Sequence, residues 1–132
     1  MQVIHTQIEL RSAVQAARRS GHTIGLVPTM GALHAGHLSL VEAARRAGDF
    51  VVATIFVNPT QFAPHEDFER YPRTLDVDLA ALAACGTNVV FVPERSEVYR
   101  PGHATFIEVG GVAEPLEGRC RPGHFRGVAT VV

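Results

Sequence analysis

Two histidines in one short segment are the residues of this sequence best suited to chemistry. His34 and His37 lie within V-P-T-M-G-A-L-H-A-G-H-L-S-L, residues 27–40, directly after an apolar run that stops at Pro28. This pattern predicts a strand, a tight turn and the beginning of a helix. A helix N-terminus carries unpaired N–H groups and the positive end of the helix dipole, so it attracts anions such as phosphate. The segment therefore predicts a phosphate-binding turn to which the histidines add donors.

A metal site is the second chemistry that such a pair could support. Zinc needs three or four protein ligands at suitable spacing. The nearest candidates, His65, Cys85 and Cys120, follow no such pattern, so we expect no metal. The segment also lacks the G-x-x-x-x-G-K-[ST] pattern of P-loops and the G-x-G-x-x-G pattern of dinucleotide binders. The structural alternative is that His34 and His37 only cap the helix.

Three short apolar runs predict the strands that position this turn. The runs are residues 23–27, 49–57 and 88–92. Helical spacing of apolar residues separates them, over residues 38–47 and 74–85, and a capping box at residues 6–9 (T-Q-I-E) begins a further helix. Because strands and helices alternate, we expect an α/β fold, a Rossmann-like parallel sheet with helices on both faces.

The other segments show weaker patterns. Residues 60–73 are polar and carry three aromatic side chains, which is compatible with a substrate-facing lid or with an ordinary linker. We expect the Thr74 side chain to cap the helix that follows it. Residues 105–109 alternate like a half-exposed strand, and residues 110–123 have the glycines and prolines of a loop.

The composition describes an ordinary globular domain. The 132 residues are 46% hydrophobic and 19% charged, with a formal net charge of -1, which favours neither a nucleic-acid nor a membrane partner. All 12 basic residues are arginine, so no lysine is available to bind a phosphate. The sequence shows no signal-peptide pattern, no apolar run of the roughly 20 residues that a membrane helix needs, and no paired cysteine motif. We expect a cytoplasmic protein.

Four blocks of the sequence carry a resemblance to a known family. The first contains H-A-G-H, which is similar to the HxGH signature of the nucleotidyltransferase and class I aminoacyl-tRNA synthetase superfamily. Within that superfamily the chain resembles the pantothenate synthetase (pantoate–β-alanine ligase) family. The blocks are P-T-M-G-A-L-H-A-G-H (28–37), F-V-N-P-T-Q-F (56–62), Y-P-R-T (71–74) with Asp78, and R-P-G-H-F-R-G-V (121–128). They occur in the family's order and span most of the chain.

The resemblance implies an ATP-dependent ligase. Pantoate would attack the α-phosphate of Mg-ATP to give pantoyl adenylate and pyrophosphate, and β-alanine would then displace AMP to give pantothenate. Gln61 would hold pantoate and border the β-alanine site, while Asn58, Tyr71 and His124 would line the pocket. The structural alternatives are a strand-ending turn for Asn58 and packing for Tyr71 and His124. The implied ATP site comprises Met30, Gly31, Ala32, Leu33, His34, Ala35, Gly36 and His37, with His37 and His34 as the catalytic pair.

The chain departs from the family at its end. Family members continue into a loop that contains Lys and Asp, and then into a smaller C-terminal domain. We therefore expect residues 1–132 to be a single N-terminal ATP- and pantoate-binding domain of a truncated chain, and the family implies a homodimer. Two alternatives stay open. One is another HxGH nucleotidyltransferase acting on a phosphorylated substrate, and the other is an inactive nucleotide-binding half-domain.

Overall fold

The computed structural model describes residues 1–63, 66 and 68–132, so the metal candidate His65 and part of the expected lid lie outside the described residues. Four parallel strands form one sheet in the order β1-β4-β3-β2. The strands are β1 (Gln2–Ile4), β2 (Ile24–Thr29), β3 (Phe50–Ile55) and β4 (Val89–Phe91). The helices are α1 (Gln7–Arg19), α2 (Ala35–Ala47), α3 (Leu75–Ala84), α4 (Arg95–Val98), α5 (Glu117–Cys120) and α6 (His124–Val131), with 3-10 turns at Pro59–Gln61 and Gly111–Ala113.

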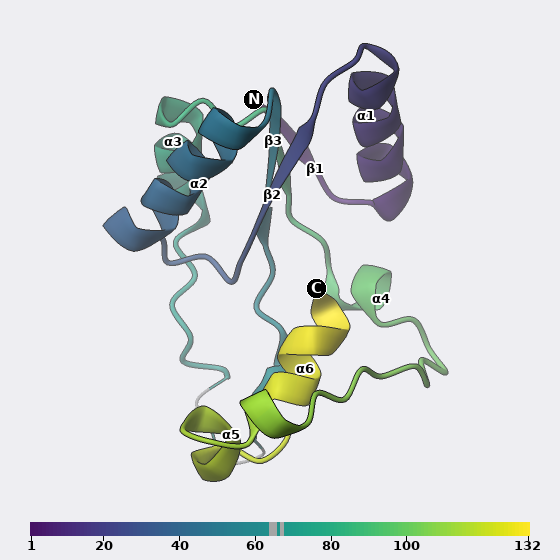
Figure 1. Ribbon diagram of the computed structural model, residues 1–132, viewed down its shortest axis with the longest axis vertical. Coiled ribbons are helices and arrows are strands. Elements are labelled where there is room, and N and C mark those ends of the chain that lie inside the picture. The colour runs from purple at the N-terminus through teal and green to yellow at the C-terminus, as the bar shows by residue number, and fades with distance from the viewer. Residues whose placement is uncertain (64–65, 67) are drawn as a thin grey trace.

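Helices cover both faces of the sheet, as Figure 1 shows. On one face α2 and α3 place Val41 and Leu82 against Ala53 and its neighbours in β3 and β4. On the other face Leu10 of α1 packs against a cluster that includes Val52. The central strand β3 is therefore buried on both sides, which explains why its sequence is almost continuously apolar. The expected α/β class and Rossmann-like layering are confirmed.

The weaker patterns were the ones that failed. The strand expected over residues 105–109 is wrong, because this segment forms no strand and its residues are exposed, with the N–H of Ile107 bonded to Thr130 Oγ1 (3.0 Å). The sequence pattern did not identify β1, which is too short to show periodicity, or α6, which follows Gly123 in the left-handed conformation. Thr74 occupies the N-cap position of α3, but its hydroxyl donates to Asp78 Oδ2 (3.2 Å) and makes no cap bond.

The segments that are expected to bind ligands follow the carboxyl ends of the strands. The expected phosphate-binding turn follows β2, residues 56–62 follow β3, and Pro93 follows β4. Helix α6 lies beyond this edge of the sheet, away from the two helical layers (Figure 1). Ligands of parallel α/β sheets bind in a crevice at this edge. Among the described residues, no helix combines the length and the apolarity needed to cross a membrane.

Candidate active site

The turn between β2 and α2 has an unusual backbone. Gly31 and Ala32 are both left-handed, with φ values of +82° and +52°. The N–H of Gly31 donates to Thr29 Oγ1 (3.1 Å), that of Ala32 to Asp78 Oδ2 (3.0 Å) and that of Leu33 to Asp78 Oδ1 (2.8 Å). The implied ATP site runs from Met30 to His37, and it carries the expectation that the backbone N–H groups along this turn are free to bind the nucleotide. That expectation is wrong for these three residues, because the chain's own side chains accept from them.

Both histidines cap α2. His34 is the N-cap residue, and its Nδ1 accepts from the N–H of Gly36 (3.1 Å). His37 Nδ1 accepts in return from the N–H of His34, at a long 3.4 Å. A ring nitrogen that accepts carries no proton, so each neutral ring holds its proton on Nε2. Capping and ligand binding are therefore compatible, because the cap leaves Nε2–H as an outward donor.

Burial and charge keep His37 neutral. Desolvation lowers the pKa of His37 below its usual value of 6.5, the neighbouring His34 ring lowers it further, and Asp78 opposes both effects. The two ring centroids lie 4.2 Å apart. His37 is thus a neutral hydrogen-bond donor at physiological pH, placed at the positive end of the α2 dipole.

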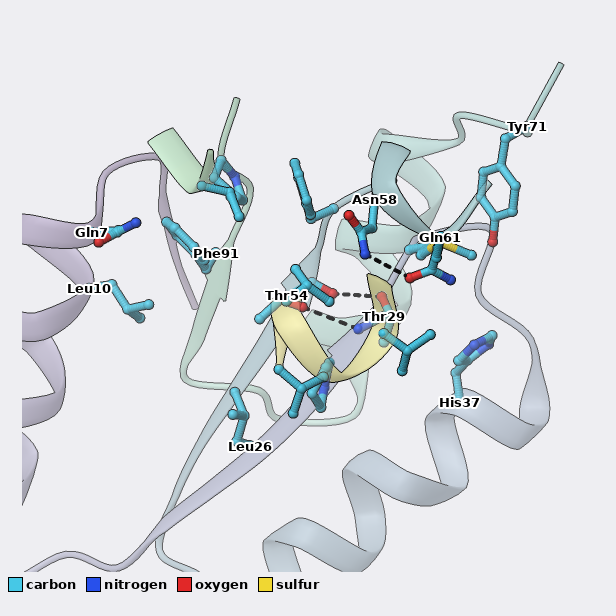
Figure 2. A pocket seen from close by; sticks show the side chains of 18 of the residues that line it. Gln7, Leu10, Leu26, Thr29, His37, Thr54, Asn58, Gln61, Tyr71 and Phe91 are labelled. Atoms are coloured by element: carbon cyan, nitrogen blue, oxygen red, sulfur yellow. Dashed lines mark hydrogen bonds between the residues drawn. The ribbon is translucent and has the colours of Figure 1, made fainter. Parts of the chain in front are cut away.

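A pocket of about 530 Å³ opens beside this turn (Figure 2). It contains five of the residues predicted for the site, which are Met30, His37, Asn58, Gln61 and Tyr71. The other predicted residues do not line it, and they are Gly31, Ala32, Leu33, His34, Ala35, Gly36 and His124. The pocket also includes residues that sequence reasoning did not single out, among them Thr29, Thr54, Phe56 and Val131.

Asn58 lines the pocket and is the centre of a hydrogen-bond network. Its side chain is buried, with 1% of the residue exposed. Its Oδ1 accepts from the Tyr99 hydroxyl (2.8 Å) and from both the N–H and the hydroxyl of Thr60. Its Nδ2 donates to Gln61 Oε1 (3.0 Å) and to the carbonyl of Gly127 (3.0 Å). Because its polar atoms are all engaged within the chain, Asn58 acts by holding its neighbours. Tyr99, which lies outside the sequence blocks, was missed.

The hydrogen bond from Asn58 determines which end of the Gln61 amide is available to a ligand in the pocket. Since Gln61 Oε1 accepts from Asn58, the Nε2 amide group is the end left to donate into the pocket (Figure 2). The Gln61 backbone carbonyl accepts from His124 Nδ1 (3.0 Å) and Arg121 Nη2 (3.5 Å). A Cβ on Gly127 would come within 2.5 Å of the Thr60 carbonyl, so only glycine allows this close approach. Residues 121–128 therefore position Gln61 by contacts with the Gln61 backbone and with the neighbouring Thr60.

An ion pair holds the C-terminal block against the segment after Gln61. Arg121 Nε and Nη2 donate to the two carboxylate oxygens of Glu66, at 2.6 and 3.1 Å. The Arg121 guanidinium, helped by the N–H of Ala63, lowers the pKa of Glu66 to about 2. This bidentate geometry makes the pair directional as well as charged. The pair stays ionised across the whole range of pH at which the protein would work.

Replacing Asn58 with alanine should destabilise the fold. The change removes the donor to the Gly127 carbonyl and the Asn58 acceptor of the Tyr99 hydroxyl, which keeps its contact with Thr60 Oγ1 (3.1 Å), and the loss of a buried hydrogen bond costs about 1–3 kcal/mol. We expect the free energy of unfolding, measured by urea denaturation, to fall by about 2 kcal/mol. The exposed Gln15 of α1 is a matched control. Gln15→Ala should change stability by less than about 0.5 kcal/mol, and an equal loss in both variants would contradict the role of Asn58.

Comparison with known proteins places the chain beside one group. The family model for pantoate-beta-alanine ligase matches residues 2–132. The pantothenate synthetase of Roseiflexus sp. (strain RS-1) is 61% identical over 132 residues, which cover 100% of this chain and 46% of the relative. That of Paracoccus denitrificans (strain Pd 1222) is 58% identical over 130 residues, 98% of this chain and 46% of the relative. The chain thus spans about half the length of the curated relatives it matches.

Solved structures agree with the sequence matches. The crystal structure of pantothenate synthetase from Thermus thermophilus has a TM-score of 0.91 and 50% identity, over 99% of this chain and 46% of that chain. The pantoate-beta-alanine ligase from Francisella tularensis has a TM-score of 0.89 and 40% identity, over 99% of this chain and 50% of that chain. The Francisella structure is described as complexed with beta-gamma ATP and beta-alanine.

Proposed function

We propose, because the chain belongs to the pantoate–β-alanine ligase family, that its pocket binds ATP and pantoate and serves the condensation of pantoate with β-alanine. One observation carries the proposal. His37, at the start of α2, and Gln61, held by Asn58, line the same pocket of about 530 Å³. A donor for phosphate oxygens and a donor for a carboxylate or hydroxyl thus face one shared space, as an adenylating reaction requires.

The first step is a nucleotidyl transfer. A carboxylate oxygen of pantoate attacks the α-phosphorus of ATP, the bond to the bridging oxygen of the β-phosphate breaks, and pyrophosphate leaves with that electron pair. His37 donates Nε2–H to the phosphate oxygens, and the α2 dipole favours the negative charge there. Gln61 Nε2 orients pantoate without adding a charge of its own. Alignment and charge stabilisation are the chain's contributions.

The second step forms the amide bond. The amine of β-alanine attacks the acyl carbon of pantoyl adenylate, the acyl–phosphate bond breaks, and AMP leaves while the amine loses a proton. Gln61 borders both substrates in this arrangement. Its single free amide group therefore faces the carboxyl carbon of pantoate in both steps.

Magnesium belongs to the nucleotide in this proposal. Among the described residues, no three His, Cys, Asp or Glu side chains gather as a metal site, and both oxygens of Asp78 already accept N–H groups. Mg²⁺ prefers phosphate oxygens and water when few carboxylates are offered. We therefore propose that Mg-ATP binds as the substrate and that these residues supply no ligand set for the ion.

Pyrophosphate exchange tests the proposed function. Labelled pyrophosphate should enter ATP only when pantoate is present, because the reversal of the first step needs pantoyl adenylate. Omitting β-alanine should not stop the exchange. Exchange that is independent of pantoate, or that requires a phosphorylated substrate instead, would favour another HxGH nucleotidyltransferase. Binding of ATP without exchange, measured by calorimetry on residues 1–132, would favour a nucleotide-binding half-domain.

The family also leads us to propose a homodimer in the cytoplasm. Sedimentation equilibrium tests the assembly, because a dimer has twice the 14.2 kDa of this chain. A single species at the monomer mass across the micromolar range would contradict it.

A further inference from the structure

Asp78 is a buried carboxylate that the proposed chemistry does not use. It lies on α3, 46 residues from the turn in sequence, and is 2% exposed. Its Oδ2 accepts from the N–H of Ala32 (3.0 Å) and from the Thr74 hydroxyl (3.2 Å), while its Oδ1 accepts from the N–H of Leu33 (2.8 Å). A buried charge persists only where several donors compensate it, and these three donors do so.

The turn that Asp78 contacts is unfavourable without it. Ala32 holds a φ of +52°, which is costly for a residue with a Cβ. Gly31, at φ +82°, is in a conformation that strains any residue with a side chain, and a Cβ there would lie tightly against Asp78 Oδ2 and Ile55 Cγ2, at 3.1 Å from each. The left-handed backbone at Gly31 and Ala32 brings the N–H groups of Ala32 and Leu33 to the Asp78 carboxylate, and these hydrogen bonds stabilise that backbone conformation.

The bonded N–H groups form the kind of concavity that usually receives an anion. Successive backbone N–H groups in left-handed turns make such nests, and phosphates commonly occupy them. Here the Asp78 carboxylate fills that place for Ala32 and Leu33. A phosphate approaching the turn is thus excluded from these donors by position and by charge. What stays open to it is the start of α2, where His37 lines the pocket.

We propose that Asp78 is a positioning residue of the nucleotide site, which occupies the nest of the β2–α2 turn and so directs the phosphates of ATP to the start of α2. This inference rests on the proposed binding of ATP at this turn. Asp78 acts through the backbone of Ala32 and Leu33, since both of its oxygens accept from donors of the protein. Its charge also reaches His37, whose pKa it raises against the stronger effects of burial and His34.

Asp78→Asn and Asp76→Asn form a matched pair of variants. Both residues lie in the first turn of α3, but Asp76 is exposed and Asp78 is buried. An amide at position 78 keeps one acceptor and turns an NH₂ group toward a backbone N–H. We expect D78N to remove the slow hydrogen exchange of the Ala32 and Leu33 amides and to weaken ATP binding, measured by calorimetry, at least tenfold. D76N should leave both within twofold of the wild type.

A second pair separates positioning from stability. Ala32→Gly removes the cost of the left-handed φ, so the double variant D78N/A32G should regain much of the lost thermal stability. If Asp78 acts by positioning, ATP affinity in the double variant should stay at least fivefold below that of A32G alone. Affinity that recovers together with stability would overturn the proposal and leave Asp78 a purely structural role.

Two further outcomes distinguish this inference from the function on which it rests. If D78N does not fold, Thr74→Val still removes one donor to the carboxylate at constant side-chain volume, and unchanged amide exchange and ATP affinity in T74V would overturn the inference. If the wild type binds no ATP, the proposed function fails. If the wild type binds ATP and D78N binds it equally well with its amides unprotected, the function stands and the inference fails.

Discussion

Replacing His37 with alanine is expected to lower the rate of pantoate-dependent pyrophosphate exchange by about 100-fold or more, the usual loss when one preorganised donor to a developing charge is removed. The structural reason is that His37 lies at the start of α2, lines the pocket and carries its proton on Nε2. The change also removes the acceptor for the N–H of His34, but that bond is long at 3.4 Å, so stability should change little.

His22→Ala is the control for the His37 variant. His22 is exposed and lies before the amino end of β2, whereas the turn with His37 follows the carboxyl end of that strand. Its replacement should leave the exchange rate within twofold of the wild type. Thermal melting of both variants separates a lost donor from a lost fold. An H37A enzyme with an exchange rate within threefold of the wild type would return His37 to a capping role alone.

Gln61→Glu should weaken the binding of pantoate with almost no change in side-chain shape. One carboxylate oxygen can still accept from Asn58 Nδ2, as Gln61 Oε1 does (3.0 Å). The other oxygen then replaces the Nε2 donor and turns a negative charge toward the carboxylate of pantoate. Losing a hydrogen bond to a charged group and adding like-charge repulsion costs about 3 kcal/mol, so the KM for pantoate should rise about 100-fold.

The Gln61 variant has internal and external controls. The affinity for ATP, measured by calorimetry in the absence of pantoate, should stay within threefold, because His37 and the start of α2 are untouched. Gln15→Glu, an identical change at an exposed position of α1, should alter neither constant. If Q61E weakened ATP and pantoate binding equally, the pocket as a whole would have been disturbed, and the specific role of the Nε2 group would be contradicted.

The expected core of the fold followed directly from local patterns. The apolar runs at β3 and β4 are continuous because both faces of the sheet are covered there, whereas β2 buries Val27 and leaves Leu26 exposed beside the pocket. The capping box at Thr6 is present with its reciprocal bonds. The strand β1 was not predictable, because three residues show no period and Ile4 is buried by tertiary packing against β3, β4 and α1. Helix α6 was also not predicted, because it packs on the turn that contains Thr60 and Gln61 rather than on the sheet.

The amino-acid sequence by itself determined the turn with His34 and His37 and the family blocks, because each depends on residue type and local spacing. The proposed role of Gln61 rests on the block in which it lies. The tertiary structure alone decided how these parts work together. Asp78 reaches the turn from 46 residues away, and Gly127 reaches Asn58 from 69 residues away. A hydrogen bond needs its two atoms about 3 Å apart. Only the folded chain brings such distant residues to that distance, so which N–H groups are filled and which amide faces the pocket follow from the packing.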